Sequence, residues 1–454
     1  MMRSRLIAAI LSAWVMPGLL HAADEPLSLP TVVERVVSRS PSLRAAQAQV
    51  QQAEAGRREA SLMRLPLLSA RSSFSRGDHP VYVFGSLMEQ GRFSASNFAI
   101  DALNHPGDLT NIQSALELGV PLFTGFSLSS RIRQAELAEQ DARSGESGRA
   151  LGLRSQVSEL FLQILLDDSL LKNLEDRLAA SEAEIKDARR LKDRGLVLGS
   201  DYYAAESIFG GLHVWRTQVQ TDRTTAAARL AELTKKEGWK PAGILTETVY
   251  AIPSRTELLN MALARRPELQ SAASQVAMAQ VGAQQARRTV LPNVQAFAAL
   301  ETNTNDFSSN PSNHLLGVAA RVPFGDPAYF ARRAAASSGE EVAQRSRESL
   351  EESIRMDVRQ AYENYQGTLA SLPMAKETQE RAARSLELFR PLYRSGRQSI
   401  IEVLRAEEGL ARAEAAYWQT LFRIHTGYVQ LLSSAGALDD KAIQEIARHL
   451  EVRP

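Results

Sequence analysis

The sequence predicts a mixed fold in which transmembrane β-strands alternate with very long α-helices, within a helix–β-hairpin–long helix module that occurs twice. Three observations support this fold class. Two stretches of about 65 residues carry apolar side chains at helical spacing. Four segments of about ten residues alternate apolar with polar or small side chains. Residues 41–66 also match residues 267–292 position by position, which indicates an internal repeat.

The composition narrows the functional classes. The chain has 454 residues and a formal net charge of +1, so no overall basic field indicates nucleic-acid binding. It has no cysteine, which excludes disulfides, thiolate nucleophiles, Cys-ligated metals and lipid attachment to an N-terminal Cys. The seven histidines are scattered, and no HExxH, GxSxG or phosphate-binding loop occurs. We therefore expect no enzyme activity, no cofactor, no metal site and no nucleic-acid partner.

The N-terminus has the pattern of an export signal. Two arginines precede an apolar run over residues 6–20, and small residues follow at Ala22 and Ala23. The run is short for a membrane-spanning helix and contains a proline, so an uncleaved anchor is the less favoured alternative. We predict a signal peptide over residues 1–22 and export of the rest of the chain.

The repeat divides the exported chain. The match begins at Pro41 and Pro267 and continues without gaps to Leu65-Pro66 and Leu291-Pro292. A proline suits the first turn of a helix, where its missing N–H costs nothing, and a Leu-Pro step ends a helix and can open an edge strand. The predicted divisions are a first repeat over 23–236, a linker over 237–265, a second repeat over 266–434 and a C-terminal tail over 435–454.

Strands are expected at the four alternating segments, which cover residues 67–76, 112–123, 293–302 and 314–324. About ten residues suffice for a tilted strand to cross the hydrocarbon of a bilayer. Taken alone, these segments also fit an amphipathic hairpin on a soluble core. Arg71, Glu117, Glu301 and Arg321 fall on the polar face and are candidates for lining a barrel lumen. The long loop 77–111 is expected at the outer end of the first hairpin.

Long helices are expected over about 128–194 and 329–393, followed by return helices over 201–236 and 400–432. A helix of about 65 residues is roughly 100 Å long, which no single globular core can surround, so it belongs in a coiled coil or a tube. Gly195 and Gly396 lie where each long helix must reverse, and glycine permits that reversal.

Four strands cannot close a membrane barrel, because the smallest closed barrels have about eight strands and lipid tolerates no open sheet edge. The chain must therefore combine its strands with those of other copies. Three copies supply twelve strands and twelve helical columns around one axis. Twelve is an even number of strands within the known range for membrane barrels. We predict a trimeric 12-stranded β-barrel continued by a 12-column α-helical barrel in the periplasm.

Together, the export signal, the repeated modules and the Leu-Pro and Val-Pro segments resemble the TolC-type outer-membrane efflux family over essentially the whole exported chain. The most specific match runs from Tyr393 to Leu404 and resembles the family's helix-tip segment. The resemblance implies a homotrimer in the outer membrane that extends into the periplasm. It also implies an exit duct of a tripartite efflux or type I secretion system, which contacts outer-membrane lipid, a periplasmic adaptor (membrane fusion) protein and an inner-membrane pump. A soluble periplasmic coiled-coil scaffold or adaptor is the alternative.

The resemblance also assigns candidate site residues near the tips. Glu402 matches the first acidic position of the pore constriction, whereas Arg405 stands at the second, so the two can pair internally rather than form an acidic ring. Tyr393 would link neighbouring helices through its hydroxyl in the closed state. The alternatives are that Glu402 is an ordinary solvated helix residue and that Tyr393 only packs between helices. Candidates for the tip turns and adaptor contacts are Gly195, Leu196, Gly199, Ser200, Gly396 and Ser399.

Overall fold

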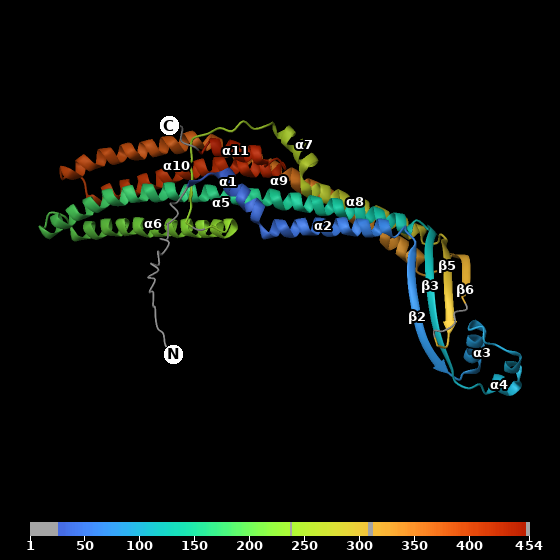
Figure 1. The fold of residues 1–454 in the computed structure, drawn as a ribbon. Coiled ribbons are helices and arrows are strands. Elements are labelled where there is room, and N and C mark those ends of the chain that lie inside the picture. The colour runs from blue at the N-terminus through green and yellow to red at the C-terminus, as the bar shows by residue number, and fades with distance from the viewer. Residues whose placement is uncertain (1–25, 237, 307–311, 451–454) are drawn as a thin grey trace, which may run out of the picture.

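The computed structural model describes residues 26–236, 238–306 and 312–450, so the predicted signal peptide lies outside the described residues. Figure 1 shows an elongated molecule in which the long helices run side by side and a β-sheet lies at one end. The opposite end is formed by the two points at which the long helices reverse. The fold is therefore mostly helical, as expected, and the strands of its main sheet lie between helices in the sequence.

Helices occur in the same order in the two halves of the chain. The first half contains α1 (Leu29–Arg39), α2 (Pro41–Leu62), α5 (Ser127–Asp193) and α6 (Gly199–Thr234). The second half contains α7 (Arg255–Arg265), α8 (Pro267–Arg288), α9 (Tyr329–Arg394) and α10 (Ile400–Ser434). The C-terminal helix is α11 (Asp440–Arg448), and the loop after the first strand of the sheet contains α3 (Pro80–Glu89), the 3₁₀ helix η1 (Ala95–Phe98) and α4 (Ile100–Asn104).

Local sequence explains where several of these helices begin. Pro41 and Pro267 occupy the first turns of α2 and α8, where no intrahelical bond requires their missing N–H. At the start of α7, Ser254 and Glu257 form a capping box in which each side chain satisfies the other's backbone N–H. Helix α9 continues through Pro373 and Pro391, so neither proline ends it.

The sheet has four antiparallel strands in the order β2-β3-β5-β6. The strands are β2 (Leu67–Gly77), β3 (Leu109–Thr124), β5 (Asn293–Thr304) and β6 (Ser312–Arg321). Strand β6 ends at Arg321, before the expected end at residue 324, because Pro323 has no N–H to donate to a ladder. Pro121 lies inside β3, where the register to β5 shifts at a bulge, one of the few places that an inner strand accepts proline.

A second correction concerns the Leu-Pro steps. Both steps end a helix and precede a strand, but only Pro66 leads into an edge strand, β2. Pro292 leads into β5, which has neighbours on both sides. The proline is tolerated there because it precedes Asn293, the first paired residue of β5. The short parallel pair of β1 (Pro26–Leu27) and β4 (Lys240–Pro241) was not expected from the sequence.

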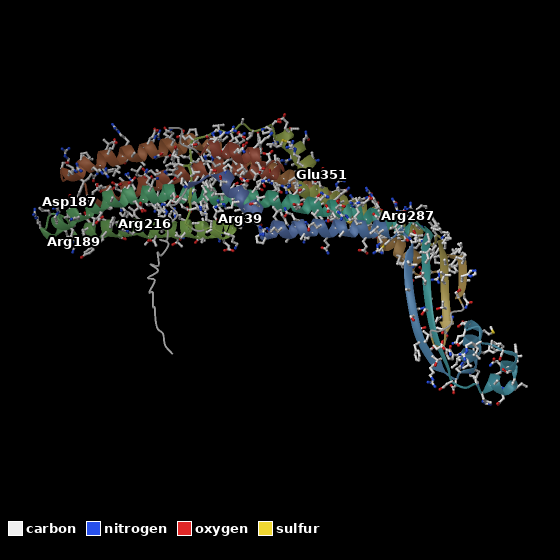
Figure 2. All side chains as sticks on the ribbon, viewed as in Figure 1. Arg39, Asp187, Arg189, Arg216, Arg287 and Glu351 are labelled. Atoms are coloured by element: carbon white, nitrogen blue, oxygen red, sulfur yellow. The ribbon has the colours of Figure 1, made fainter. Side chains whose placement is uncertain are left out.

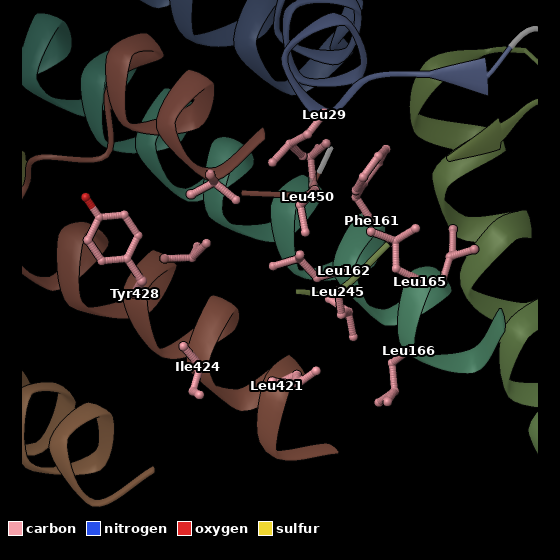
Figure 3. Packing of buried hydrophobic residues seen from close by; sticks show 14 of the residues in the cluster. Leu29, Phe161, Leu162, Leu165, Leu166, Leu245, Leu421, Ile424, Tyr428 and Leu450 are labelled. Carbon is pink, nitrogen blue, oxygen red and sulfur yellow. The ribbon is translucent and has the colours of Figure 1, made fainter. Parts of the chain in front are cut away.

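The main apolar core lies at the middle of the helical body, where α1, α5, α10 and α11 meet. Figure 3 shows Phe161, Leu162 and Leu165 of α5 packed near Leu421 and Ile424 of α10. Each is almost fully buried, and burying such a side chain contributes about 1.5–3 kcal/mol. This core fixes the two halves of the chain against each other between the sheet and the tips.

Polar and charged side chains cover the helical body along its length. Figure 2 shows Asp187 and Arg189 near the tips, Arg216 farther along, and Arg287 near the sheet. Within the described ranges, no helix combines the length and apolarity needed to cross a membrane.

Candidate channel wall and helix tips

The four strands bring the predicted lumen residues onto one face of the sheet. Arg71 lies opposite Ala115, which lies opposite Glu301, and directly opposed residues in a sheet share a face. Glu117 follows Ala115 by two positions and joins them. Arg321 lies opposite Asn293, an even number of residues from Glu301, so it lies on this face too. The alternation in the sequence therefore places all four charges together.

This polar face is connected by side-chain contacts. Arg71 and Glu117 form an ion pair at 3.4 Å. Glu301 accepts hydrogen bonds from Gln113 at 2.6 Å and from Asn303 at 2.7 Å. Because these contacts link β2, β3 and β5, they hold the polar residues in a continuous strip across the strands.

The opposite face of the sheet is apolar and exposed. Its large exposed side chains are Leu68, Phe74, Leu116, Leu118, Leu300, Leu316 and Val318. Exposed contiguous apolar surface on this scale marks contact with lipid or with another protein. In addition, among the residues that the structure describes, β2 and β6 each have a strand partner on one side only. An open edge of this length is a template for pairing with a strand of another chain.

The helix tips are closed by glycines in the left-handed backbone region. Gly195 has φ +74° and Gly396 has φ +73°, a conformation that side chains other than glycine rarely adopt. Each turn closes in the same way: Leu196 N–H donates to the Leu191 carbonyl, and Arg397 N–H donates to the Leu392 carbonyl, both at 2.9 Å. The two reversals predicted from the sequence therefore have the same turn geometry, with a left-handed glycine and the same backbone hydrogen bond.

A side-chain contact connects the two tips. Ser399 caps α10 by accepting from the Ile401 N–H at 3.2 Å, and its hydroxyl donates to the Asp201 carboxylate at 3.1 Å. Gly199 and Ser200 begin α6 beside it, while Leu196 is exposed at the end of the first tip. This contact joins the starts of α6 and α10, and the six predicted tip residues at and beside the two reversals are called the tip patch below.

The predicted gate residues lie just beyond this patch and do not all meet. Glu402 and Arg405 are partly exposed on α10 and form an ion pair at 3.0 Å within one helix. Tyr393, on α9, packs against the apolar cluster between the tips. Burial raises the pKa of the Tyr393 hydroxyl, which has no hydrogen-bond partner in the described part of the chain. The internal pairing expected from Arg405 is present, and it offsets the charge of Glu402.

A buried ionic network close to the tips was missed in the sequence. Glu407 of α10 is 0% exposed and pairs with Arg390 of α9 and, at 3.5 Å, with Arg177 of α5. Arg390 also contacts Glu184 of α5 at 3.1 Å, and Arg177 contacts Glu414 at 3.8 Å. Burial raises the pKa of both the Glu184 and the Glu414 carboxyl. Three carboxylates and two guanidiniums therefore join α5, α9 and α10.

The sequence contains only a partial signal for this network. Glu206 and Glu407 occupy matching places in the two repeats, yet Glu206 is exposed and accepts from Tyr202 of its own helix. Glu407 is buried because α5 and α9 both pack around that part of α10. Because both residues are glutamates at matching places, the sequence does not distinguish them. Only the packing of the helices shows that Glu206 is solvated and that Glu407 is buried in an ionic network.

The fold and these surfaces define a class of protein: a long helical body joined to a short sheet that has one lipid-compatible face and two open edges. Residues 32–234 and 258–437 match the outer membrane efflux protein family. The chain belongs to this family, which comprises outer-membrane transport ducts and not enzymes, and this assignment does not favour the soluble scaffold. No curated protein matches the chain.

Solved structures with the same fold include three outer membrane channels. CmeC of Campylobacter jejuni has 15% identity and a TM-score of 0.80, with 93% of this chain and 90% of that chain covered. OprN has 18% identity and a TM-score of 0.77, with 90% of each chain covered. MtrE of Neisseria gonorrhoeae, in its open state, has 16% identity and a TM-score of 0.75, with 91% and 90% covered.

Proposed function

We propose that three copies of this chain form the exit channel of a tripartite efflux or type I secretion system. In this arrangement β6 of each copy pairs with β2 of the next, and the twelve strands close a barrel in the outer membrane. The helices of the repeated modules continue the barrel as a tube through the periplasm. The observation that supports this proposal most strongly is the sheet, which has an exposed apolar face, a charged opposite face and two edges that no other described strand pairs with.

In this barrel, one face of the sheet is in contact with lipid and the other with water. Lipid contacts the apolar face, and Arg71, Glu117, Glu301 and Arg321 line the water-filled lumen. Charged side chains on the lumen face of such barrels tune ion selectivity. A passive duct needs no catalytic group, and the energy for transport comes from an inner-membrane pump.

The helix tips form the periplasmic entrance of the channel. Glu402, Arg405 and Tyr393 lie around the constriction, and a periplasmic adaptor protein contacts the tip patch of Gly195, Leu196, Gly199, Ser200, Gly396 and Ser399. Because Arg405 forms an ion pair with Glu402, the constriction is less negative than it would be with an acidic residue at both positions. Block by divalent cations should accordingly be weak.

Single-channel current in planar bilayers tests this proposal, with detergent-purified protein that lacks residues 1–22. Discrete, long-lived openings are expected, together with a larger conductance for Glu402→Ala. Glu408→Ala is the matched control, because Glu408 forms the same kind of intrahelical pair on α10, with Arg412 at 2.6 Å. Channels that treat both variants alike would remove Glu402 from the gate, and protein that stays soluble without detergent would contradict the channel.

A further inference from the structure

The loop between β2 and β3 folds into a small helical insertion, residues 78–108, at the end of the sheet far from the helix tips (Figure 1). It contains α3, η1 and α4, and its three phenylalanines contact one another. Phe93 contacts Phe84 and Phe98 edge to face, with ring centroids 4.8 Å and 5.1 Å apart. The insertion is therefore an ordered unit with a defined position on the sheet.

A series of buried amides attaches this insertion to the charged face of the sheet. Gln90, at the end of α3, donates to the Asn111 side chain at 3.0 Å and to the Thr110 carbonyl at 2.8 Å. Asn111 donates to Asn303 at 2.8 Å, and Asn303 donates to Glu301 at 2.7 Å. Gln90, Asn111 and Asn303 are all at most 5% exposed. Buried and satisfied amides of this kind fix one geometry, because an unpaired amide is costly.

The register shows on which face this attachment lies. Gln113 lies opposite Asn303, and Asn111 precedes Gln113 by two positions, so both asparagines share the face of Glu301. Helix α3 contacts β5 as well as β3, although the insertion connects β2 to β3. Tyr82 of α3 adds an anchor by donating to the backbone carbonyl of Ser75 at 3.0 Å. The insertion is therefore attached to the outer end of the charged face, where it reaches from β2 past β3 to β5.

We propose that the insertion is folded into the outer mouth of the channel, where it meets the insertions of the two other copies. This inference rests on the proposed trimeric channel, in which the charged face lines the lumen. The insertion exposes Val81, Phe98 and Ile100, the last at 78%. Apolar side chains in an aqueous mouth are best covered by a surface of the same kind, and three-fold symmetry brings the three insertions together around the axis. The result is a second constriction, at the opposite end from the helix tips.

Labelling of a lumen cysteine from outside intact cells tests this outer constriction, because the natural chain has no cysteine. Ser69→Cys places the reporter on the charged face of β2, close to the helical end of the sheet. A small hydrophilic maleimide should label it readily. A bulky polyethylene-glycol maleimide should label it at least about tenfold more slowly than in a chain whose residues 79–107 are replaced by an Asn-Gly turn. Equal rates for the bulky reagent would overturn the inference.

Two further variants keep the test independent of the deletion. Gln90→Ala combined with Tyr82→Phe removes the anchors at unchanged chain length and should also speed bulky labelling of the reporter. Ile100→Cys should form disulfide-linked dimers within the trimer, and its recovery as monomer under oxidising conditions would contradict the meeting of the insertions. Ala70→Cys, which lies opposite Leu116 on the apolar face, should resist both reagents. If Ala70→Cys is labelled and Ser69→Cys is not, the assignment of the lumen, and with it the proposed channel, is wrong.

Discussion

His425, on α10, shows how one buried side chain couples this fold to pH. Its ring is 0% exposed, with Nδ1 2.6 Å from the Tyr250 hydroxyl and Nε2 3.1 Å from the Thr246 carbonyl. Burial lowers the pKa of the His425 imidazole to about 4, because the charged form loses its hydration. The neutral ring can accept from Tyr250 and donate to Thr246, whereas a protonated ring would donate at both nitrogens.

We predict that acid destabilises the folded chain through His425. Between about pH 6.5 and pH 4 the unfolded chain binds a proton at this side chain that the folded chain does not. Stability therefore falls as the pH is lowered through this window, by up to about 3 kcal/mol from this group. Thermal unfolding in detergent at about pH 7 and about pH 5 checks this. His425→Gln should reduce the difference in melting temperature, whereas His213→Gln, at an exposed position, should leave it unchanged.

At the tip, Gly396→Ala should loosen the turn. Its φ of +73° costs an L-residue about 1–2 kcal/mol, although no atom lies within 4 Å of the added methyl group. Hydrogen exchange of the amides after residue 396 should therefore become faster. Gly199→Ala is the matched control, because Gly199 is helical and its Cβ would also meet open space. Equal exchange in the two variants would show that backbone conformation is not what limits the tip.

At the scale of elements, much of this architecture was predictable because each long element carries its own boundary signals. Pro41, Pro267, Gly195 and Gly396 mark helix starts and reversals by local chemistry alone. Strand alternation likewise indicated the charged face, since the pleat converts period two directly into sidedness. The alternation predicted which residues share the charged face. It did not predict which of them contact each other, such as Asn111 and Asn303, because those contacts depend on the register between strands.

Elements that depend on contacts between distant segments were not predictable in the same way. The ionic network around Glu407 requires α5 and α9 to flank α10, and no local pattern states which helices will be neighbours. The insertion was expected as an irregular loop, because α3 and α4 are too short to show helical periodicity. Its attachment through Gln90 is a tertiary contact, which produces no periodic pattern in the sequence.

The network predicts a large effect for Arg390→Met. This change leaves Glu184 and Glu407 without their nearest guanidinium in a buried site, which typically costs about 3–5 kcal/mol. Because the network joins α5, α9 and α10 behind the tip, the variant should also open the entrance more often in planar bilayers. Arg384→Met, on the same helix, breaks only an exposed pair with Glu387 at 3.3 Å and should change stability by about 1 kcal/mol or less.

Partial rescue would identify the cause of this effect. Adding Glu407→Gln to Arg390→Met removes the unpaired buried charge while nearly preserving shape, so stability should recover in part. If the double variant is no more stable than Arg390→Met alone, then lost packing of the long arginine side chain is responsible and not the unpaired carboxylate.

At the scale of the whole molecule, the proposed assembly depends on the two open edges of the sheet. Within one chain β2 and β6 are separated by β3 and β5, so their Cα atoms lie about 14 Å apart at the usual strand spacing. A disulfide requires Cα atoms within about 7 Å. Any disulfide between these two strands must therefore join different copies of the chain, and the absence of natural cysteines makes such a bond easy to detect.

We predict that Ser73→Cys on β2 will cross-link to a cysteine at one or two neighbouring positions of β6. The scan covers charged-face positions of β6, which are Asn313, Leu315, Gly317 and Ala319. A closed ring has an even number of antiparallel strands, so β6 of one copy runs antiparallel to β2 of the next and one or two neighbouring positions should form covalent trimers on denaturing gels. Gln113→Cys on the inner strand β3 is the control, because both of its edges are already paired within the chain. Cross-linking at no position of β6, or equally well from β3, would show that the edges do not meet and that the exposed sheet needs a different partner.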